Sequence, residues 1–206
     1  TFTTWRQSVA YNFDRNRHVQ PYTGPRQELH IGMDFNVTPG TATIAAIDTK
    51  VHVFDELHLE GTHTQEMCDV INSKYPGIKK IVYPDPACRQ KRTSAGGKTD
   101  LSILQNNGFI CKLRSAHTPI KDRVNSLNTK LMNAANEIGM YIDPKCKHLI
   151  RSLERLSYKD DSSVIEKSGE EHIFDACSYM IDYLYPVTTQ HSQKPIERFT
   201  YRGGRF

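Results

Sequence analysis

The amino-acid sequence predicts an α/β domain in which helices cover the faces of a mixed five-stranded sheet. Three segments near the N-terminus alternate apolar and polar residues with the period of two typical of strands, and short turns separate them. Two further short apolar runs alternate with helical patterns, an order that gives a mixed sheet flanked by helices. The chain has 206 residues, of which 37% are hydrophobic and 24% are charged, so it is long enough to bury a sizeable core.

The first strand shows the alternation most clearly. Leu29, Ile31 and Met33 occupy one face, while Gly32 and Asp34 occupy the other. A Pro-Gly turn follows, and the short link at residues 48–50 predicts a hairpin between the second and third strands. The five strands are expected at residues 29–37, 41–47, 51–59, 81–83 and 109–113.

Helices are predicted between and after these strands. Thr62 or Thr64 is expected to cap the first of them. Thr118 is expected to cap the third, with Pro119 at its first position, because apolar residues then recur at spacings of three and four as far as Ile138. The helices are expected at residues 62–74, 99–106, 118–138, 144–156 and 171–184.

The pattern divides the chain into three parts. Residues 1–28 lack sustained periodicity and are expected to form a linker or N-terminal extension. Residues 29–187 form the predicted domain, and residues 188–206 form a polar, basic tail that we expect to be flexible. The chain begins with Thr1 rather than Met, which suggests a fragment of a longer protein.

Composition argues against several classes of protein. No window approaches the roughly 18 consecutive apolar residues of a membrane helix, so no membrane partner is expected. The five cysteines are scattered without a CxxC pair, which argues against a zinc ribbon or a disulfide framework and favours reduced thiols. The segment 96–99 ends like a phosphate-binding P-loop, but Arg92 stands where that motif requires glycine.

Charge is distributed unevenly along the chain. The formal net charge is +4, whereas the stretch 88–130 carries nine cations against two acids. This excess favours a polyanionic partner, with a solvated basic face as the alternative. The nine cations are Arg89, Lys91, Arg92, Lys98, Lys112, Arg114, Lys121, Arg123 and Lys130.

Three aspartates form the candidate site. Asp34 lies within a strand, Asp85 ends a buried strand between two prolines, and Asp175 lies inside a nearly apolar helix. Carboxylates on elements that pack together repel one another unless cations lie between them, and hard divalent ions such as Mg²⁺ or Mn²⁺ prefer oxygen ligands. Two such ions about 4 Å apart could drive phosphodiester hydrolysis, with His172 relaying a proton or holding the site's water. Glu56 is a possible fourth acid, although a solvent-facing strand residue is the alternative.

The motifs HIGMDFNVTPG, IVYPDPA, IKDRV and HIFDACSY together resemble the C-terminal nuclease domain of tailed-phage terminase large subunits of the headful-packaging type. The resemblance covers residues 29–186 in the family's order. It implies an RNase H-like fold and an endonuclease that cuts concatemeric double-stranded viral DNA with two Mg²⁺ or Mn²⁺ ions. It assigns metal-binding and catalytic roles to Asp34, Asp85 and Asp175, with His172 beside the site. Some relatives have Glu where this chain has Asp85.

The resemblance also implies partners and a location. These are double-stranded DNA, an N-terminal ATPase domain of the same polypeptide that this sequence lacks, the small terminase subunit, and the portal protein, which the C-terminal tail could contact. The expected location is the host cytoplasm during virion assembly and not the mature virion. The residues expected to bind DNA phosphates are Arg89, Lys91, Arg92, Lys98, Lys121 and Arg123.

Two other functions remain open from the residues. A transposase, integrase or junction resolvase would keep this fold with a different reaction, although transposases and retroviral integrases usually have Glu where Asp175 stands. A non-catalytic DNA-binding or portal-binding module would keep the fold without the chemistry, which three intact acids argue against.

Overall fold

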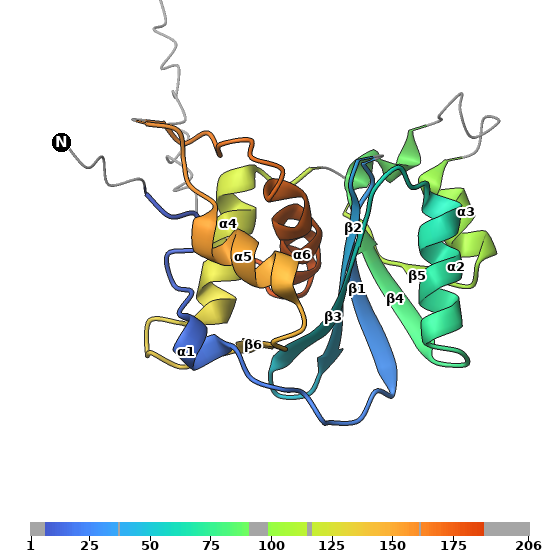
Figure 1. Cartoon of the computed structure of the whole chain (residues 1–206), viewed down its shortest axis with the longest axis horizontal. Coiled ribbons are helices and arrows are strands. Elements are labelled where there is room, and N and C mark those ends of the chain that lie inside the picture. The colour runs from blue at the N-terminus through green and yellow to red at the C-terminus, as the bar shows by residue number, and fades with distance from the viewer. Residues whose placement is uncertain (1–6, 37, 91–98, 115–116, 161, 188–206) are drawn as a thin grey trace, which may run out of the picture.

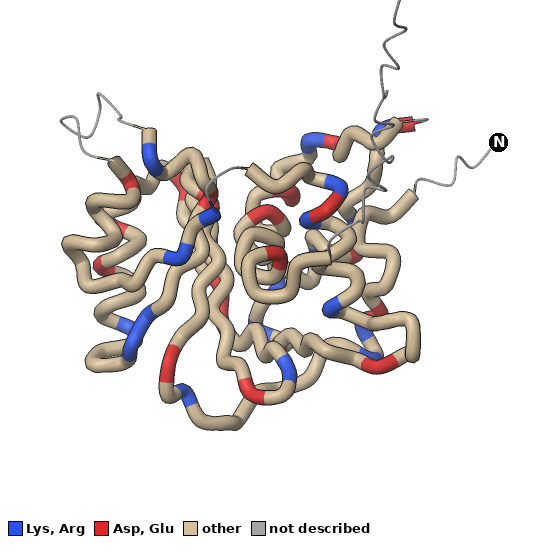
Figure 2. The backbone as a smooth tube through the Cα atoms, turned by 180° about the vertical axis from the view of Figure 1, so that it is seen from behind, with Lys and Arg blue, Asp and Glu red and all other residues tan. Residues whose placement is uncertain are grey.

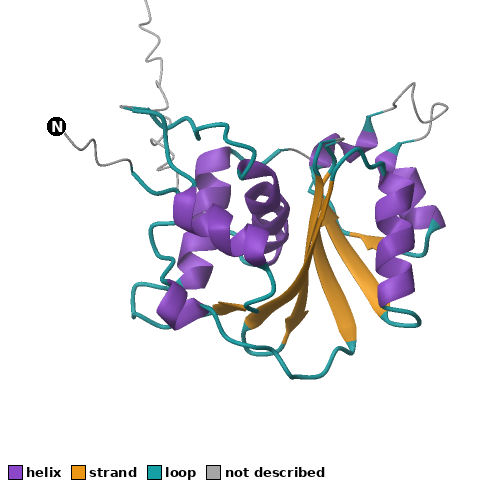
Figure 3. Cartoon of the chain, in the orientation of Figure 1, coloured by secondary structure: helices purple, strands orange, loops and turns teal. Residues whose placement is uncertain are grey.

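The computed structural model describes residues 7–36, 38–90, 99–114, 117–160 and 162–187. A mixed six-stranded sheet divides the molecule into two helical layers (Figure 1, Figure 3). The elements in chain order are α1 (Arg15–His18), β1 (Glu28–Asp34), β2 (Gly40–Ile47), β3 (Val51–Leu59), α2 (Thr64–Lys74), β4 (Lys79–Pro84), η1 (Pro86–Arg89), α3 (Asp100–Asn106), β5 (Ile110–Cys111), α4 (Ile120–Leu131), β6 (Met140–Ile142), α5 (Lys147–Arg155) and α6 (Glu171–Leu184).

The strand order across the sheet is β5-β4-β1-β2-β3-β6. Strands β1, β2 and β3 form the predicted antiparallel meander, and β4 pairs with β1 in parallel. Because β1 and β4 run the same way, their carboxyl ends meet at one edge of the sheet. The backbone N–H of Asp85 donates to the carbonyl of Met33 at 3.0 Å, which brings the chain after β4 beside the end of β1.

Strand β6 corrects the prediction of five strands. Its three residues pair in parallel with β3, and sequence alternation is not recognisable over so short a segment. The predicted helix 118–138 is also too long, because apolar spacing in the sequence continues past the real helix end at Leu131 almost to the start of β6. The chain leaves the helix there because the Asn133 side chain accepts from the backbone N–H groups of Ala135 and Glu137 and builds a turn instead.

Caps and ends also differ from the predictions in detail. His63, rather than a threonine, caps α2, because its ring nitrogen accepts from the Glu66 N–H at 3.2 Å. Pro119 precedes α4 with no side-chain cap, and the Thr118 hydroxyl donates to Asp182 instead. Helix α5 begins at Lys147, and two N–H groups of its first turn donate to the carboxylate of Glu56 on strand β3.

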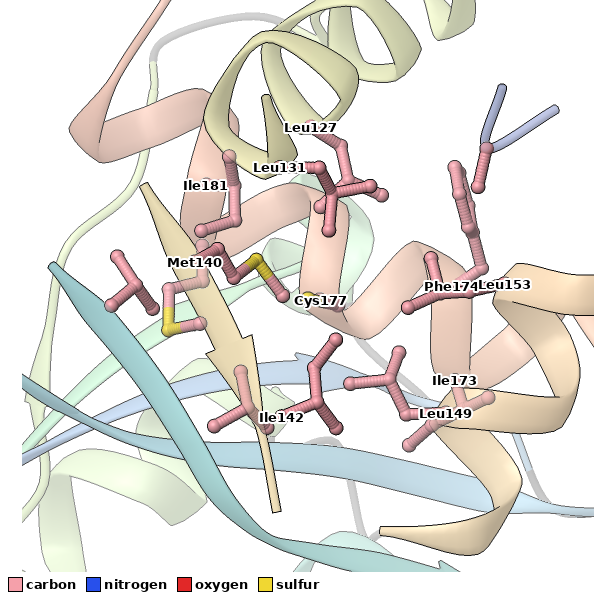
Figure 4. Packing of buried hydrophobic residues seen from close by; sticks show 14 of the residues in the cluster. Leu127, Leu131, Met140, Ile142, Leu149, Leu153, Ile173, Phe174, Cys177 and Ile181 are labelled. Carbon is pink, nitrogen blue, oxygen red and sulfur yellow. The ribbon is translucent and has the colours of Figure 1, made fainter. Parts of the chain in front are cut away.

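Two hydrophobic clusters hold the layers to the sheet. Leu29, Ile31 and Met33 of β1 pack with α2 and α3 on one face, as their alternation predicts. Helices α4, α5 and α6 cover the other face, and their residues Leu127, Leu149 and Phe174 meet in the cluster of Figure 4. Burying each of these large side chains stabilises the fold by roughly 1.5–3 kcal/mol, so α6 is fixed firmly against the sheet.

The segment before β1 contributes to the second cluster. Val9 and Ala10 are buried, and His18 is also completely buried, with its Nε2 3.1 Å from the Leu131 carbonyl oxygen. Part of the stretch 1–28, which the sequence suggests is a linker, therefore packs as an integral part of the folded unit. The predicted basic tail, 188–206, lies outside the described residues.

The cysteines and the lengths of the helices also bear on predictions from the sequence. All five cysteines are free thiols, as the sequence suggests, and four of them are buried in the core. Within the described part of the chain, every helix is too short or too polar to cross a lipid bilayer.

Candidate active site

The site lies where β1 ends against the first turns of α6. Gly32 of β1 makes this contact possible, because a Cβ atom there would lie 1.9 Å from the backbone oxygen of Ala176. The bare glycine lets the helix approach the sheet closely. Asp175 precedes Ala176 and Asp34 follows Gly32 by two residues, so the same contact brings the two carboxylates toward each other.

Asp34 is buried, with 5% of its surface exposed. Its Oδ2 accepts from the Asn36 amide at 2.6 Å and lies 3.2 Å from Nδ1 of His172. Burial raises the pKa of Asp34 to about 6; the charges of Asp175 and Asp85 raise it too, while His172 opposes the shift. Asp34 therefore lies within electrostatic range of the other three predicted catalytic residues.

His172 is held from both sides at the beginning of α6. The Thr41 hydroxyl donates to its backbone carbonyl at 2.9 Å, and the Asn36 amide nitrogen lies 2.8 Å from its Nδ1. Thr41 is the partner of Asp34 across the β1–β2 ladder, so a strand pair fixes the ring beside the carboxylate. The imidazole is therefore placed to hold or transfer a proton at Asp34.

Asp85 lies at the margin of the site. Its side chain caps the η1 turn by accepting from the Ala87 N–H at 2.9 Å, and Nδ1 of the exposed His117 lies 3.8 Å from Oδ1. Among the described residues, no group of three or more His, Cys, Asp or Glu side chains is arranged to hold a metal ion. The structure thus brings Asp34 and Asp175 to one place and leaves Asp85 engaged with its own turn.

Asp175 forms an ion pair that the sequence does not predict. The Arg123 guanidinium donates to Asp175 Oδ1 at 2.8 Å. Burial raises the pKa of Asp175, and the charge and hydrogen bond of Arg123 oppose the rise. Arg123, which the sequence predicts as a phosphate contact, is only 6% exposed and pairs with Asp175.

The other cations of the basic stretch lie in varied surroundings. Arg89 and Lys121 are exposed, at the end of η1 and in the first turn of α4. Lys130 lies 3.7 Å from the centre of the Tyr185 ring. Figure 2 shows basic and acidic segments interspersed along the described backbone. The predicted phosphate contacts Lys91, Arg92 and Lys98 lie outside the described residues.

Sequence reasoning missed Asn36 and the pairing of Arg123 with Asp175. Asn36 follows Asp34 by two positions, so the strand period places both on the same face, and that signal could have identified it. Arg123 precedes the core residue Leu127 by four positions and therefore shares its helix face. A cation on the inward face of an amphipathic helix requires an acid as its partner, which is Asp175 here.

Glu56 is a capping residue for α5 and lies apart from the aspartates' contacts. Its two carboxylate oxygens accept from the backbone N–H groups of His148 and Leu149 at 2.8 and 2.9 Å. These are among the first N–H groups of the helix, which lack partners within it. Burial raises the pKa of Glu56, while these two hydrogen bonds lower it.

Replacing Glu56 by Ala is therefore expected to lower the free energy of unfolding by about 1–2 kcal/mol, the usual effect of losing such a cap. Urea unfolding measures the change, with Glu60→Ala at the exposed end of β3 as the control. If the chain has the nuclease activity that its motifs imply, we expect that activity, measured below the unfolding transition, to stay within about twofold of the unmodified chain. Loss of cutting without loss of stability would make Glu56 a fourth acid of the site.

The raised pKa of Asp34 predicts how stability without metal depends on pH. The ordinary carboxyl value is about 3.9, so between this value and about 6 the folded protein binds more protons at Asp34 than the unfolded chain does. This group therefore favours folding at low pH, and that contribution is lost as the pH rises through about 6. We expect the protein in EDTA to be more stable at pH 5.0 than at pH 7.5, relative to Asp34→Asn, by about 1–2 kcal/mol. An identical pH dependence in both proteins would contradict this account.

Comparison with solved structures identifies the class of this fold. The chain has an RNase H-like fold, and it shares that fold with nuclease domains of phage large terminases. The large terminase of a thermophilic bacteriophage, solved in complex with ATP-γ-S, superposes with a TM-score of 0.69 at 18% identity, over 87% of this chain and 46% of that protein. The chain therefore spans less than half the length of that large terminase.

Isolated nuclease domains match over nearly their whole length. The P22 large terminase nuclease domain gives a TM-score of 0.63 at 14% identity, covering 86% of this chain and 93% of that one. The nuclease of thermophilic phage G20c with bound magnesium gives 0.59 at 13% identity, covering 87% and 98%. No protein-family model matches the sequence, and no curated protein matches it.

Proposed function

We propose that this chain is a divalent-metal-dependent endonuclease that cleaves double-stranded viral DNA during genome packaging. The single observation that carries the proposal is the pair of carboxylates on the contacting faces of β1 and α6, the buried Asp34 and the partly buried Asp175. Two desolvated acids that repel each other are costly to the fold, and perturbed groups of this kind are concentrated at functional sites. Asp85 at the adjacent strand end is the proposed third acid.

The chemistry of the donor set fits Mg²⁺ or Mn²⁺. Asp34, Asp175 and Asp85 offer hard carboxylate oxygens, which these ions prefer over nitrogen or sulfur. The solved nucleases of SPP1 and G20c contain Mn and magnesium respectively. Bound at these acids, two such ions would activate a water and stabilise the leaving oxygen of a phosphodiester. His172 would hold or transfer a proton at Asp34, since its Nδ1 lies 3.2 Å from Oδ2 of that carboxylate.

The DNA would lie across the edge of the sheet that presents these acids. Arg89 ends the turn that follows Asp85, and Lys121 lies in the first turn of α4, the helix whose Arg123 contacts Asp175. Both cations are exposed, and we propose that both contact phosphates together with Lys91, Arg92 and Lys98. The N-terminal ATPase domain, the small subunit and the portal remain proposed partners on the likeness to terminases alone, as does action in the host cytoplasm.

The test is nicking and linearisation of supercoiled plasmid by the purified chain with Mn²⁺ or Mg²⁺ and with EDTA. We expect cutting with little sequence preference that EDTA abolishes. Parallel assays of strand transfer and of four-way-junction cleavage address the transposase, integrase and resolvase alternatives. Activity confined to strand transfer or to branched DNA would overturn the packaging-nuclease proposal. Absence of both cutting and Mn²⁺ binding would favour a non-catalytic binding module.

A further inference from the structure

Arg123 is anchored to one short stretch of α6 by three contacts. It donates to Asp175 Oδ1 at 2.8 Å and to the Ser178 hydroxyl oxygen at 2.5 Å, and its guanidinium lies 4.3 Å from the centre of the Tyr179 ring. Ser178 in turn donates to the Asp175 backbone carbonyl at 2.9 Å. Because these residues are three and four positions after Asp175, they lie on its helix face. The planar guanidinium is therefore held in one orientation.

The two oxygens of Asp175 are consequently not equivalent. Oδ1 is occupied by Arg123, whose side chain is only 8% exposed, whereas the Asp175 side chain keeps 27% of its surface accessible. The partners of Asp34, by contrast, are the neutral Asn36 amide and His172. Asp175 therefore has a fixed, fully charged partner, Arg123, which contacts it from the protein interior.

We propose that Arg123 is a positioning residue of this site, holding one oxygen of Asp175 so that the other is presented in a single orientation to the metal and substrate. The inference rests on the proposed nuclease function and deepens it. A cation next to a divalent-ion site also repels the ion, so Arg123 has two opposite effects. It weakens metal binding by its charge, and it raises turnover by keeping the carboxylate in its productive geometry.

These opposite effects separate positioning from a merely structural role. In Arg123→Met, which removes the charge at similar volume, we expect Mn²⁺ to bind at least about threefold more tightly, by calorimetry without DNA. At saturating Mn²⁺, we expect kcat for plasmid nicking to fall at least about 30-fold, since misplacement of a catalytic group by about 1 Å is enough for such losses. A variant that is merely damaged would lose both properties together.

Two milder variants decide the matter if the Met variant does not fold. Arg123→Lys keeps the charge but has a single point donor in place of the planar fork. We expect unchanged Mn²⁺ affinity and a roughly tenfold lower kcat. Ser178→Ala removes one anchor of the guanidinium without altering any charge, and we expect unchanged affinity with a kcat about threefold to tenfold lower. Arg155→Met, on the exposed face of α5, is the control for loss of a cation.

The proposal is overturned if Arg123→Lys and Ser178→Ala both turn over at the control rate, or if Arg123→Met folds but binds Mn²⁺ no more tightly than the unmodified chain. Failure of the nuclease function itself is recognised separately. In that case the unmodified chain binds Mn²⁺ but cuts no DNA, and the affinity change in Arg123→Met, with none in Arg155→Met, still decides whether Arg123 acts on the ion through Asp175.

Discussion

Replacing Asp34 by Asn is expected to lower Mn²⁺-dependent plasmid nicking by at least about 1,000-fold while leaving the fold intact. The substitution keeps the size of the side chain and its ability to accept from Asn36, but it removes a negative charge from the centre of the site. Metal-assisted hydrolysis depends on that charge to hold the ion, and loss of one essential group of a catalytic unit removes most of its rate enhancement. Initial rates of nicking at saturating Mn²⁺ measure the effect.

The same variant is expected to be more stable than the unmodified chain when no metal is present. At pH 7.5 the buried Asp34 carboxylate is charged and faces Asp175, so an amide there relieves both desolvation and repulsion. A gain of about 1–2 kcal/mol in EDTA follows. Asp69→Asn, exposed on α2 across the sheet, is the matched control and should alter neither property. An inactive Asp34→Asn that has also unfolded would not support the assignment, and one that cuts at the control rate would refute it.

Gly32→Val is expected to produce the largest loss of stability of any substitution at the site. Even a single Cβ would lie 1.9 Å from the Ala176 backbone oxygen and 3.1 Å from the Thr43 hydroxyl. The first of these neighbours is the backbone of a packed helix, so α6 must move off the sheet by roughly an ångström or more. Overpacking of this kind costs about 3 kcal/mol or more, a large share of the roughly 5–15 kcal/mol that stabilises a typical domain.

Urea unfolding of Gly32→Ala and Gly32→Val measures this cost. Gly24→Ala is the control, because the atoms nearest to its added Cβ belong to the Tyr22 side chain rather than to the backbone. We also expect Gly32→Ala, where it remains folded, to lose nicking, since moving α6 separates Asp175 from Asp34. Retention of both stability and nicking in Gly32→Ala would show that the close contact of β1 with α6 does not define the site.

Period and polarity of the sequence were enough to predict most of the sheet. The alternation in β1 correctly predicts which residues face α2 and which face α6. Both faces of this strand are buried, and successive side chains still point to opposite faces. It fails in β3, where Asp55 and Val53 pair with the adjacent β2 residues Ile44 and Ala45 and leave Phe54 as an extra residue between them. Val53 therefore faces one cluster, and Phe54 and Leu57 face the other. A bulge of this kind depends on the partner strand, which the local sequence does not describe.

The geometry of the candidate site was less predictable than the sheet. The motifs predict Asp34, Asp85, Asp175 and His172 as its residues; the structure places His172 beside Asp34 and leaves Asp85 engaged with its own turn. No local pattern indicated that Arg123 contacts Asp175. These two residues are 52 positions apart in the chain and lie on different helices. Long-range pairing of a buried cation with a partly buried acid is set by packing of the two helices, so it becomes visible only in three dimensions.

A crystal structure of the chain grown or soaked in Mn²⁺ tests the central claim most directly. Anomalous scattering locates the ions without reference to the protein. We predict Mn²⁺ bound between Asp34 and Asp175, with Asp85 completing the site and the Arg123 guanidinium still on Asp175 Oδ1. Mn²⁺ bound elsewhere, with these two carboxylates free of metal at saturating concentration, would contradict the assignment of this site as the nuclease centre.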